Sequence, residues 1–173
     1  MTIWRVTLAP LRWDGDHLSA PVIRPATNAD TEKVRALIFT VLDEYGLEPA
    51  PKTTDKDLSD LESFYAGGLF DVLETPAGDI IGTVGLLPMG DGVAELRKMY
   101  LKQSARGRGH GKRLLTHAIK QAKELGFRRI ELQTARVLEE ALGLYAKYGF
   151  APSPEAALER RCDQALALDL KTA

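Results

Sequence analysis

The chain has 173 residues, of which 45% are hydrophobic and 27% are charged, and its formal net charge is −1. This profile is typical of one globular domain of ordinary size. A charge so close to neutral argues against a bulk attraction to nucleic acid or to anionic membranes. Cys162 is the single cysteine, which suits a reducing cytosol. Arg5 interrupts the apolar stretch at the start and no later stretch reaches the length of a membrane span, so we expect a soluble, cytoplasmic protein.

Residues 1–20 are predicted to form an N-terminal extension or edge strand, ahead of a single domain over residues 21–173. Residues 22–26 are typical of a short strand that stops at Pro25. Thr27 and Asp30 then match a capping box, which predicts the start of a helix. Apolar residues follow at helical spacing, and Gly46 is a natural end for that helix. This stripe consists of Val34, Leu37, Ile38, Val41, Leu42 and Tyr45.

The remaining elements are predicted from changes in the apolar period. A second amphipathic stretch ends at Gly67 and Gly68, and strands over residues 70–74, 80–87 and 93–101 form an antiparallel meander. Helices are predicted around Leu114–Leu125 and over 138–148, and strands over 129–134 and 165–170. Residues 93–134 predict a parallel pair of strands with a crossover helix. The expected fold class is mixed α/β, with about six to seven strands and about four helices.

A glycine-rich turn, Arg106-Gly107-Arg108-Gly109-His110-Gly111-Lys112, lies between a predicted strand and a predicted helix. The start of a helix exposes unpaired N–H groups and the positive end of the helix dipole, so it can bind an anion. Glycines let the backbone approach phosphate oxygens closely. From Leu96 to Lys123 the chain has no Asp or Glu, but nine Lys or Arg residues. The turn is therefore predicted to bind phosphate, and the alternative is a tight turn with solvated cations.

Two common phosphate-binding motifs fit this turn poorly. A Walker loop needs a first glycine and a Ser or Thr, where this chain has Arg106 and Arg113. A dinucleotide fingerprint needs Gly-x-Gly-x-x-Gly and an acid near the end of the next strand. Here the spacing is Gly-x-Gly-x-Gly, and the next strand ends in Gln133 and Thr134.

The turn resembles the Arg/Gln-x-x-Gly-x-Gly/Ala motif of the GNAT superfamily of N-acetyltransferases, which Arg106 to Gly111 match after a strand, as in that family. Residues 141–150 also resemble the Ala-x-x-Leu-Tyr-x-Lys-x-Gly-Phe segment of the family. The resemblance covers about residues 21–170 and leaves the first twenty without a counterpart. It implies the GNAT fold, in which two parallel strands splay apart and the pantetheine arm of acetyl-CoA enters the gap.

The resemblance implies that the cofactor is acetyl-CoA and that no metal is needed. Backbone groups around Met99, Tyr100 and Leu101 are then expected to bind the pantetheine. The pyrophosphate is expected at the glycine-rich turn, with charge-assisted contacts from Arg106, Arg108 and Lys112. The cofactor-binding residues implied in the turn are Arg106, Gly107, Arg108, Gly109, His110, Gly111 and Lys112. Many relatives have an Asn that reaches coenzyme A where this chain has Leu138, so that contact is not expected here.

Tyr145 resembles the tyrosine that protonates the departing thiolate in many members of the family. A phenol suits this role because it is a weak acid, close in acidity to a thiol. The alternative is a buried aromatic residue on an amphipathic helix. Cys162 is interpreted as structural, so the expected mechanism is direct attack without an acyl-enzyme, with the developing oxyanion bound by N–H groups around Met99.

Glu95 is the candidate general base. A protonated amine has no lone pair, and holding a lysine-like amine neutral at pH 7 costs about 4–5 kcal/mol, so a base must take the proton directly or through water. Glu95 precedes Arg106 by eleven residues, the spacing of the glutamate base in the histone-acetylating branch of the family. The alternative is a strand carboxylate that faces solvent or pairs with Arg97.

The acceptor is predicted to be the primary amine of a small molecule. Residues 43–79 contain ten acidic residues against Lys52 and Lys56, a charge that would attract a cationic amine unless it only covers solvated faces. The candidate substrate-binding residues are Glu44, Tyr45, Phe64 and Phe70. The alternatives are acetylation of a protein lysine or N-terminus, and a non-catalytic acyl-CoA sensor. Family members are often dimers, so a homodimer is one expected assembly, and neither nucleic acid nor membrane is an expected partner.

Overall fold

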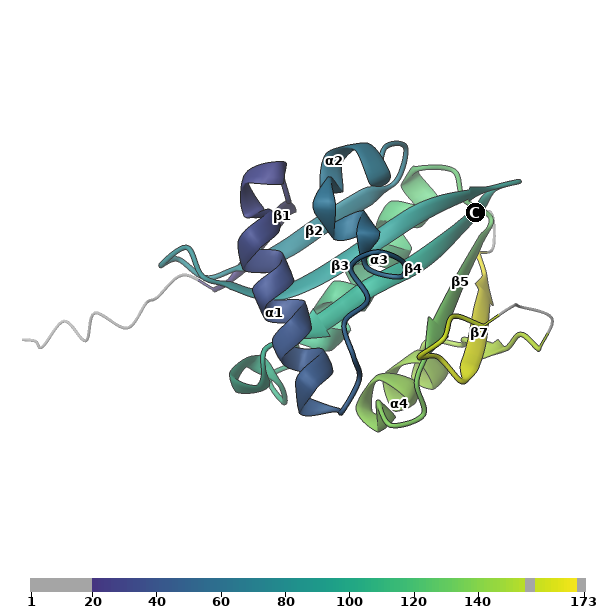
Figure 1. Ribbon diagram of the computed structural model, residues 1–173. Coiled ribbons are helices and arrows are strands. Elements are labelled where there is room, and N and C mark those ends of the chain that lie inside the picture. Colours follow the sequence, from purple (N-terminus) through teal and green to yellow (C-terminus); the bar gives the residue numbers. More distant parts are fainter. Residues whose placement is uncertain (1–19, 155–157, 171–173) are drawn as a thin grey trace, which may run out of the picture.

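The N-terminal half of the fold begins with a capped helix over an antiparallel sheet, in a computed structural model that describes residues 20–154 and 158–170 (Figure 1). Strand β1 (Val22–Pro25) ends at its proline, and the Thr27/Asp30 capping box is present at the 3₁₀ turn that leads into α1 (Thr31–Glu44). The predicted second helix is shorter than expected: a 3₁₀ turn over Lys56–Ser59 precedes α2 (Leu61–Phe64). The meander is confirmed as β2 (Leu69–Glu74), β3 (Ile80–Gly90) and β4 (Val93–Leu101).

The C-terminal half adds the crossover unit and the last three strands of the sheet. Helix α3 (His110–Glu124) connects β4 to β5 (Arg129–Thr134), and α4 (Glu139–Lys147) leads to β6 (Ala151–Pro152) and β7 (Gln164–Asp169). The described residues form one seven-stranded sheet in the order β1-β2-β3-β4-β5-β7-β6. Strands β4 and β5 are its parallel pair, which confirms the expected mixed α/β class.

Helices cover both faces of the sheet (Figure 1). One core lies under α1 and α2 and includes Val34, Ile38 and Val72, whereas the other lies under α3 and α4 and includes Leu73, Leu86 and Leu115. Adjacent residues of β2 contribute to opposite cores because successive side chains of a strand alternate between faces.

A bulge in β4 changes which residues face which core. Thr83 pairs with Tyr100 and Gly85 pairs with Arg97, so β4 has one residue more than β3 over this stretch. Ala94 before the bulge and Met99 after it are five residues apart, a separation that would place them on opposite faces of a regular strand. Because of the bulge, both pack against the same core. At the bulge Lys98 has a φ of 52°, in the left-handed region.

The parallel pair separates beyond this bulge. Pairing between β4 and β5 runs from Val93↔Arg129 to Leu96↔Leu132 and stops there, although both strands continue. The open end of this pair faces the glycine-rich turn and α4, and it positions the candidate site.

Candidate active site

The glycine-rich turn adopts a conformation that depends on its glycines. Gly107 (φ 73°) and Gly109 (φ 82°) lie in the left-handed region, and a Cβ on either would meet no other atom within 4 Å. The amide of Arg113 donates to the carbonyl of Gly109 at 3.0 Å, so the N–H groups of the preceding helical turn have no carbonyl one turn earlier to pair with. The side chains of Arg108 and Lys112 are exposed beside them. The turn thus combines open space, unpaired amides and positive charge, which is the chemistry of an anion site.

Arg106 has different side-chain contacts from those expected of it. Its Nε and Nη2 donate to the carbonyl of Leu101 at 3.1 and 3.0 Å, and Nη2 lies 2.7 Å from Oε2 of Glu44. Its guanidinium also lies 5.4 Å from the centroid of the Tyr45 ring. These contacts attach the turn to the end of β4 and to the C-terminal end of α1. Arg106 also lines the larger cavity together with Lys112, and the contact of either with a pyrophosphate stays a prediction.

His110 is the first residue of α3, and its surroundings disfavour a charged imidazole. Partial burial lowers its pKa below the usual value, and the charges of Arg113 and Arg108 lower it further. Its predicted place among the cofactor-binding residues stays a prediction.

A cavity of about 500 Å³ extends from this turn along the end of β4 to α4. This volume is in the range of ligand-binding pockets. Its walls include Met99, Tyr100 and Leu101 of β4, together with Leu138 and Ala141 near the start of α4. A Cβ added at Gly111 would lie 3.5 Å from Leu144, so the absence of a side chain at this glycine leaves more of the cavity open. The cavity therefore fits a long, thin molecule with an anionic group at the turn, as acetyl-CoA is.

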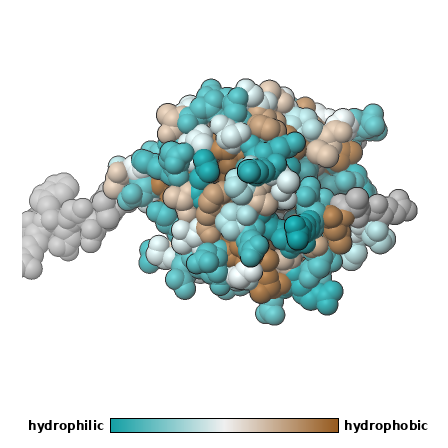
Figure 2. Space-filling view, viewed as in Figure 1, coloured by the Kyte–Doolittle hydropathy of each residue, from teal (hydrophilic) through white to brown (hydrophobic). Residues whose placement is uncertain are grey.

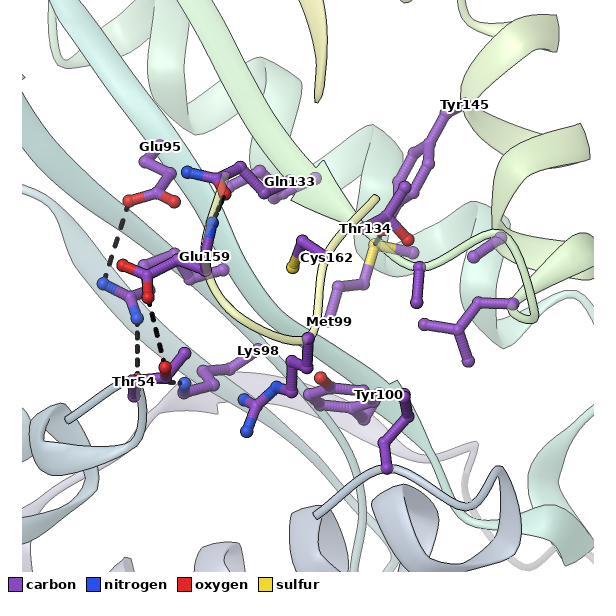
Figure 3. Close-up of a pocket in the computed structure, with 17 residues that line it drawn as sticks. Thr54, Glu95, Lys98, Met99, Tyr100, Gln133, Thr134, Tyr145, Glu159 and Cys162 are labelled. Atoms are coloured by element: carbon purple, nitrogen blue, oxygen red, sulfur yellow. Dashed lines mark hydrogen bonds and ion pairs between the residues drawn. The ribbon is translucent and has the colours of Figure 1, made fainter. Parts of the chain in front are cut away.

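A second, smaller cavity of about 70 Å³ adjoins the first one (Figure 3). Met99, Tyr100, Leu138 and Ala141 line both of them. Its other walls come from β4, β5, α4, the 47–54 segment and the 158–163 segment. The polar lining residues are Thr54, Glu95, Arg97, Lys98, Gln133, Thr134, Tyr145, Glu159, Arg161 and Cys162.

Tyr145 lines this smaller cavity from α4. Its side chain is buried, its hydroxyl lies 3.9 Å from the sulfur of Met99, and its ring packs on that of Phe150. Burial raises the pKa of Tyr145 well above the usual value, and the nearby Tyr100 adds to this. The hydroxyl is consequently a weaker acid than a thiol, which differs from the expectation, and it keeps its proton at every physiological pH.

Glu95 lines the same cavity from β4, on a different side from Tyr145 (Figure 3). Its carboxylate lies 3.7 Å from Nη1 of Arg97, beyond hydrogen-bond distance. Burial raises the pKa of Glu95 above the usual value; Arg97 opposes this shift and Glu159 adds to it. A raised pKa makes the carboxylate a stronger base, as general-base catalysis requires.

A buried ion cluster lies beside this cavity, and sequence reasoning missed it. Nζ of Lys98 lies 2.7 Å from Oδ1 of Asp55 and 2.9 Å from the carbonyl of Thr54. Arg161 binds both oxygens of Asp55, at 2.7 and 2.5 Å. The sequence placed Lys98 with the positive charge of the turn and Asp55 with a solvated acidic surface, whereas both side chains are buried. Their lack of any local motif explains why no sequence signal identified them.

The four candidate substrate-binding residues, Glu44, Tyr45, Phe64 and Phe70, lie outside the smaller cavity. Glu44 binds Arg106, and Tyr45 lines the larger cavity instead. Phe70 is buried against Tyr65 in the core, and Phe64 is on the surface. The N-terminal half does contribute to the smaller cavity, but through Leu47 and Thr54.

The described residues contain neither a candidate membrane span nor a candidate metal site. In the ranges 20–154 and 158–170 no helix has both the length and the apolar character that a membrane crossing requires. Within the same ranges no group of three or more His, Cys, Asp or Glu side chains is arranged to hold a metal ion.

Comparison with known proteins relates this site to a family. The profile of the Acetyltransferase (GNAT) family matches residues 35–150. The uncharacterized N-acetyltransferase YjgM of Escherichia coli is 35% identical over 138 residues, covering 76% of this chain and 82% of that protein. Human N-acetyltransferase 8B is 30% identical over 54% of this chain and 44% of its own length.

Solved structures share the fold. An acetyltransferase of the GNAT family from Staphylococcus aureus superposes with a TM-score of 0.83 at 23% identity, covering 88% of this chain and all of that one (100%). A GNAT superfamily phosphinothricin acetyltransferase from Sinorhizobium meliloti, solved in complex with AcCoA, gives a TM-score of 0.69 at 17% identity, with 87% of this chain and 89% of that one covered.

Proposed function

Because the chain belongs to the GNAT family of acetyltransferases and is an N-acetyltransferase, we propose that it transfers the acetyl group of acetyl-CoA to a primary amine of a small molecule, by direct attack in a ternary complex. The observation that carries this proposal is the junction of the two cavities at Met99. The larger one suits a thioester donor, and the smaller one is polar and carries both Glu95 and Tyr145. A cytoplasmic location is part of the same proposal and agrees with the single cysteine.

The donor would enter through the larger cavity. The N–H groups after Gly107 and Gly109 and the side chains of Arg108 and Lys112 would bind its pyrophosphate. Backbone groups of Met99 and Leu101 would bind the pantetheine. Once bound, acetyl-CoA supplies a thioester carbon that an amine can attack, so the chain needs no nucleophile of its own.

The general base and the group that stabilises the leaving thiolate would act from two sides of the smaller cavity. Glu95 would accept the proton of the ammonium, directly or through a water, which frees the nitrogen lone pair. The backbone N–H of Met99, beyond the bulge, would donate to the carbonyl oxygen as negative charge develops there. The hydroxyl of Tyr145 would donate a hydrogen bond to the departing sulfur. Because its pKa is raised, we assign Tyr145 the stabilisation of the thiolate by a hydrogen bond. The second proton, which the nitrogen loses as the tetrahedral intermediate collapses to the amide, would pass to this thiolate through water and give the free thiol of CoA.

The proposal is tested with the purified protein, acetyl-CoA and a panel of small primary amines, by following release of free thiol and by identifying the product by mass spectrometry. We expect amine-dependent thiol release, and we expect Tyr145→Phe to slow it about 10²- to 10⁴-fold while calorimetry finds the affinity for acetyl-CoA unchanged. Absence of any affinity for acetyl-CoA would overturn the donor assignment. Binding without transfer to any amine would favour the sensor alternative.

A further inference from the structure

The 158–163 segment lines one side of the smaller cavity and is attached to two other parts of the fold. Arg161 holds Asp55 through two hydrogen bonds and also donates to the carbonyl of Glu48 at 3.3 Å. The backbone N–H of Glu159 donates to Oε1 of Gln133 at 2.6 Å, and that of Asp163 donates to the carbonyl of Thr134 at 3.1 Å. With about 70 Å³ of space, far less than ordinary ligand pockets have, this cavity admits only the slender end of a molecule.

Three cationic side chains line this cavity, and each already has acidic or carbonyl partners within the protein. They are Arg97, Lys98 and Arg161. The ammonium of Lys98 has Asp55, Asp57 and the carbonyl of Thr54 within 3.4 Å. Arg161 is held by Asp55 as described, and Asp55 is fully buried, with 0% of its side chain exposed. Arg97 donates to the carbonyl of Thr54 at 2.8 Å and has Asp57 at 3.7 Å. These contacts leave the cations poorly available to a carboxylate on a substrate.

The two carboxylates that line the cavity are less well paired. The cation nearest to Glu95 is Arg97, at 3.7 Å. Glu159 accepts a hydrogen bond from the hydroxyl of Thr54 at 3.2 Å, and among the described residues it forms no ion pair. Figure 3 shows both carboxylates beside the same space. With Asp55 and Asp57 included, four carboxylates surround three cations, so the site as a whole is negative.

We infer that the acceptor is a small, slender amine with a second cationic group, in which Glu95 receives the reacting amine and Glu159 receives the second cation. This inference rests on the proposed function, and it makes Glu159 a residue that determines specificity. A dication would relieve the repulsion between the two carboxylates, whereas a monoamine would leave Glu159 unpaired. An amino acid would bring its own carboxylate towards Glu159, and like charges placed together disfavour binding.

Three probes with the same four-carbon chain test this inference: putrescine, n-butylamine and γ-aminobutyrate, which end in an ammonium, a methyl group and a carboxylate. We expect kcat/KM for putrescine to exceed that for n-butylamine about tenfold or more, and γ-aminobutyrate to be the poorest substrate. Glu159→Gln should reduce the putrescine value to that of n-butylamine, mainly through KM, while the affinity for acetyl-CoA stays unchanged. Glu159→Asp should keep part of the preference.

Glu48→Gln is the matched control, because Glu48 is an exposed carboxylate near the same cavity that lines neither cavity. It removes the same charge and should leave the preference intact. Equal use of the three probes by the native protein, or an unchanged preference in Glu159→Gln, would overturn the inference. If no amine of the wider panel is acetylated, the proposed function fails, and the inference is then decided by calorimetry that compares the binding of putrescine and n-butylamine to the CoA-saturated protein. Selective putrescine binding that Glu159→Gln abolishes would support it, and equal or absent binding would refute it.

Discussion

Lys98 combines an unfavourable backbone conformation with a very favourable side-chain environment. A left-handed φ at a residue with a Cβ costs roughly 1–2 kcal/mol. Here the ammonium has carboxylate and carbonyl acceptors on a buried surface, and the carbonyl of Lys98 accepts a hydrogen bond from the hydroxyl of Thr83 at 2.6 Å. The bulge is thus fixed through both ends of this residue. Its position matters because the next N–H along the strand, that of Met99, is the proposed oxyanion donor.

The strain at Lys98 can be isolated by comparing Lys98→Gly with Lys98→Ala. Both substitutions remove nearly the whole buried side chain and leave Asp55 with one cation fewer, and losing a buried partner costs about 3–5 kcal/mol. Glycine also relieves the left-handed strain, whereas alanine retains it. We therefore expect Lys98→Gly to be about 1 kcal/mol more stable than Lys98→Ala in urea unfolding. Equal stabilities would show that the conformation of this residue carries no strain.

Glu95 makes a prediction about pH. As a general base it must be deprotonated, and burial raises its pKa, so kcat/KM should fall with acidity starting at a higher pH than an ordinary carboxylate would give. Glu95→Gln should lower kcat about 10²- to 10⁴-fold and remove this acidic limb from the profile of the residual activity. The measurement is the rate of thiol release between about pH 5 and about pH 9. A variant with the native rate and profile would exclude Glu95 from the mechanism.

At the scale of elements, local patterns predicted the parts that are regular and missed those that depend on distant partners. The bounds of β5, Arg129–Thr134, agree with the prediction, because its alternation is strict. Strand β6 has only two residues, so it carries no periodicity to detect. The bulge in β4 was missed because a register shift depends on the pairing with β3. The glycine-rich turn was identified because its chemistry lies in consecutive residues.

The difference between local patterns and distant partners also explains which residues of the site could be predicted from the sequence. Glu95 and Tyr145 line one cavity, as their place in local motifs suggested, although their roles remain a proposal. The aromatic residues Phe64 and Phe70 line neither cavity, and composition alone cannot distinguish a ring that packs in the core from one that lines a pocket. The partners of the Asp55 cluster are 43 and 106 residues away along the chain, and no short motif records such a pairing.

The glycine-rich turn as an element is tested by two neighbouring glycines. Gly109 has a φ of 82° and open space around it, so alanine there meets strain but no clash. Gly111 lies inside α3 without a positive φ, and its new methyl group would make ordinary contacts. We expect Gly109→Ala to lower the free energy of unfolding by about 1 kcal/mol, and Gly111→Ala to leave it unchanged or raise it by up to about 1 kcal/mol. Effects of the same sign in thermal unfolding would contradict this account of the turn.

On the scale of the whole molecule, the Asp55 cluster joins three segments that are distant in the chain. The loop after α1 supplies Asp55, β4 supplies Lys98, and the 158–163 segment supplies Arg161. The hydropathy of the surface is mixed on the face shown in Figure 2. Beside the packing of the two apolar cores, the link between these three segments depends on one carboxylate.

This dependence predicts how the protein unfolds in acid. Burial alone would raise the pKa of Asp55, but hydrogen bonds from Arg161, the amide of Ala50 and Lys98 hold it far below the usual value. A carboxyl with a depressed pKa in the folded state adds stability above its unfolded pKa of about 3.9, and this contribution is lost as the pH falls further. Native stability should therefore decline steeply below about pH 4 in urea unfolding.

The variant Asp55→Asn should be less stable at neutral pH by about 3–5 kcal/mol, because it leaves Arg161 and Lys98 without their anion. Below about pH 4 its stability should fall less steeply than that of the native protein, since one proton fewer is taken up on unfolding. Should this variant fail to fold, Arg161→Gln keeps the Lys98 pair and should show an intermediate slope. Parallel curves for native and variant proteins would mean that carboxylates elsewhere, such as Asp30 beside Arg24, control the acid transition instead.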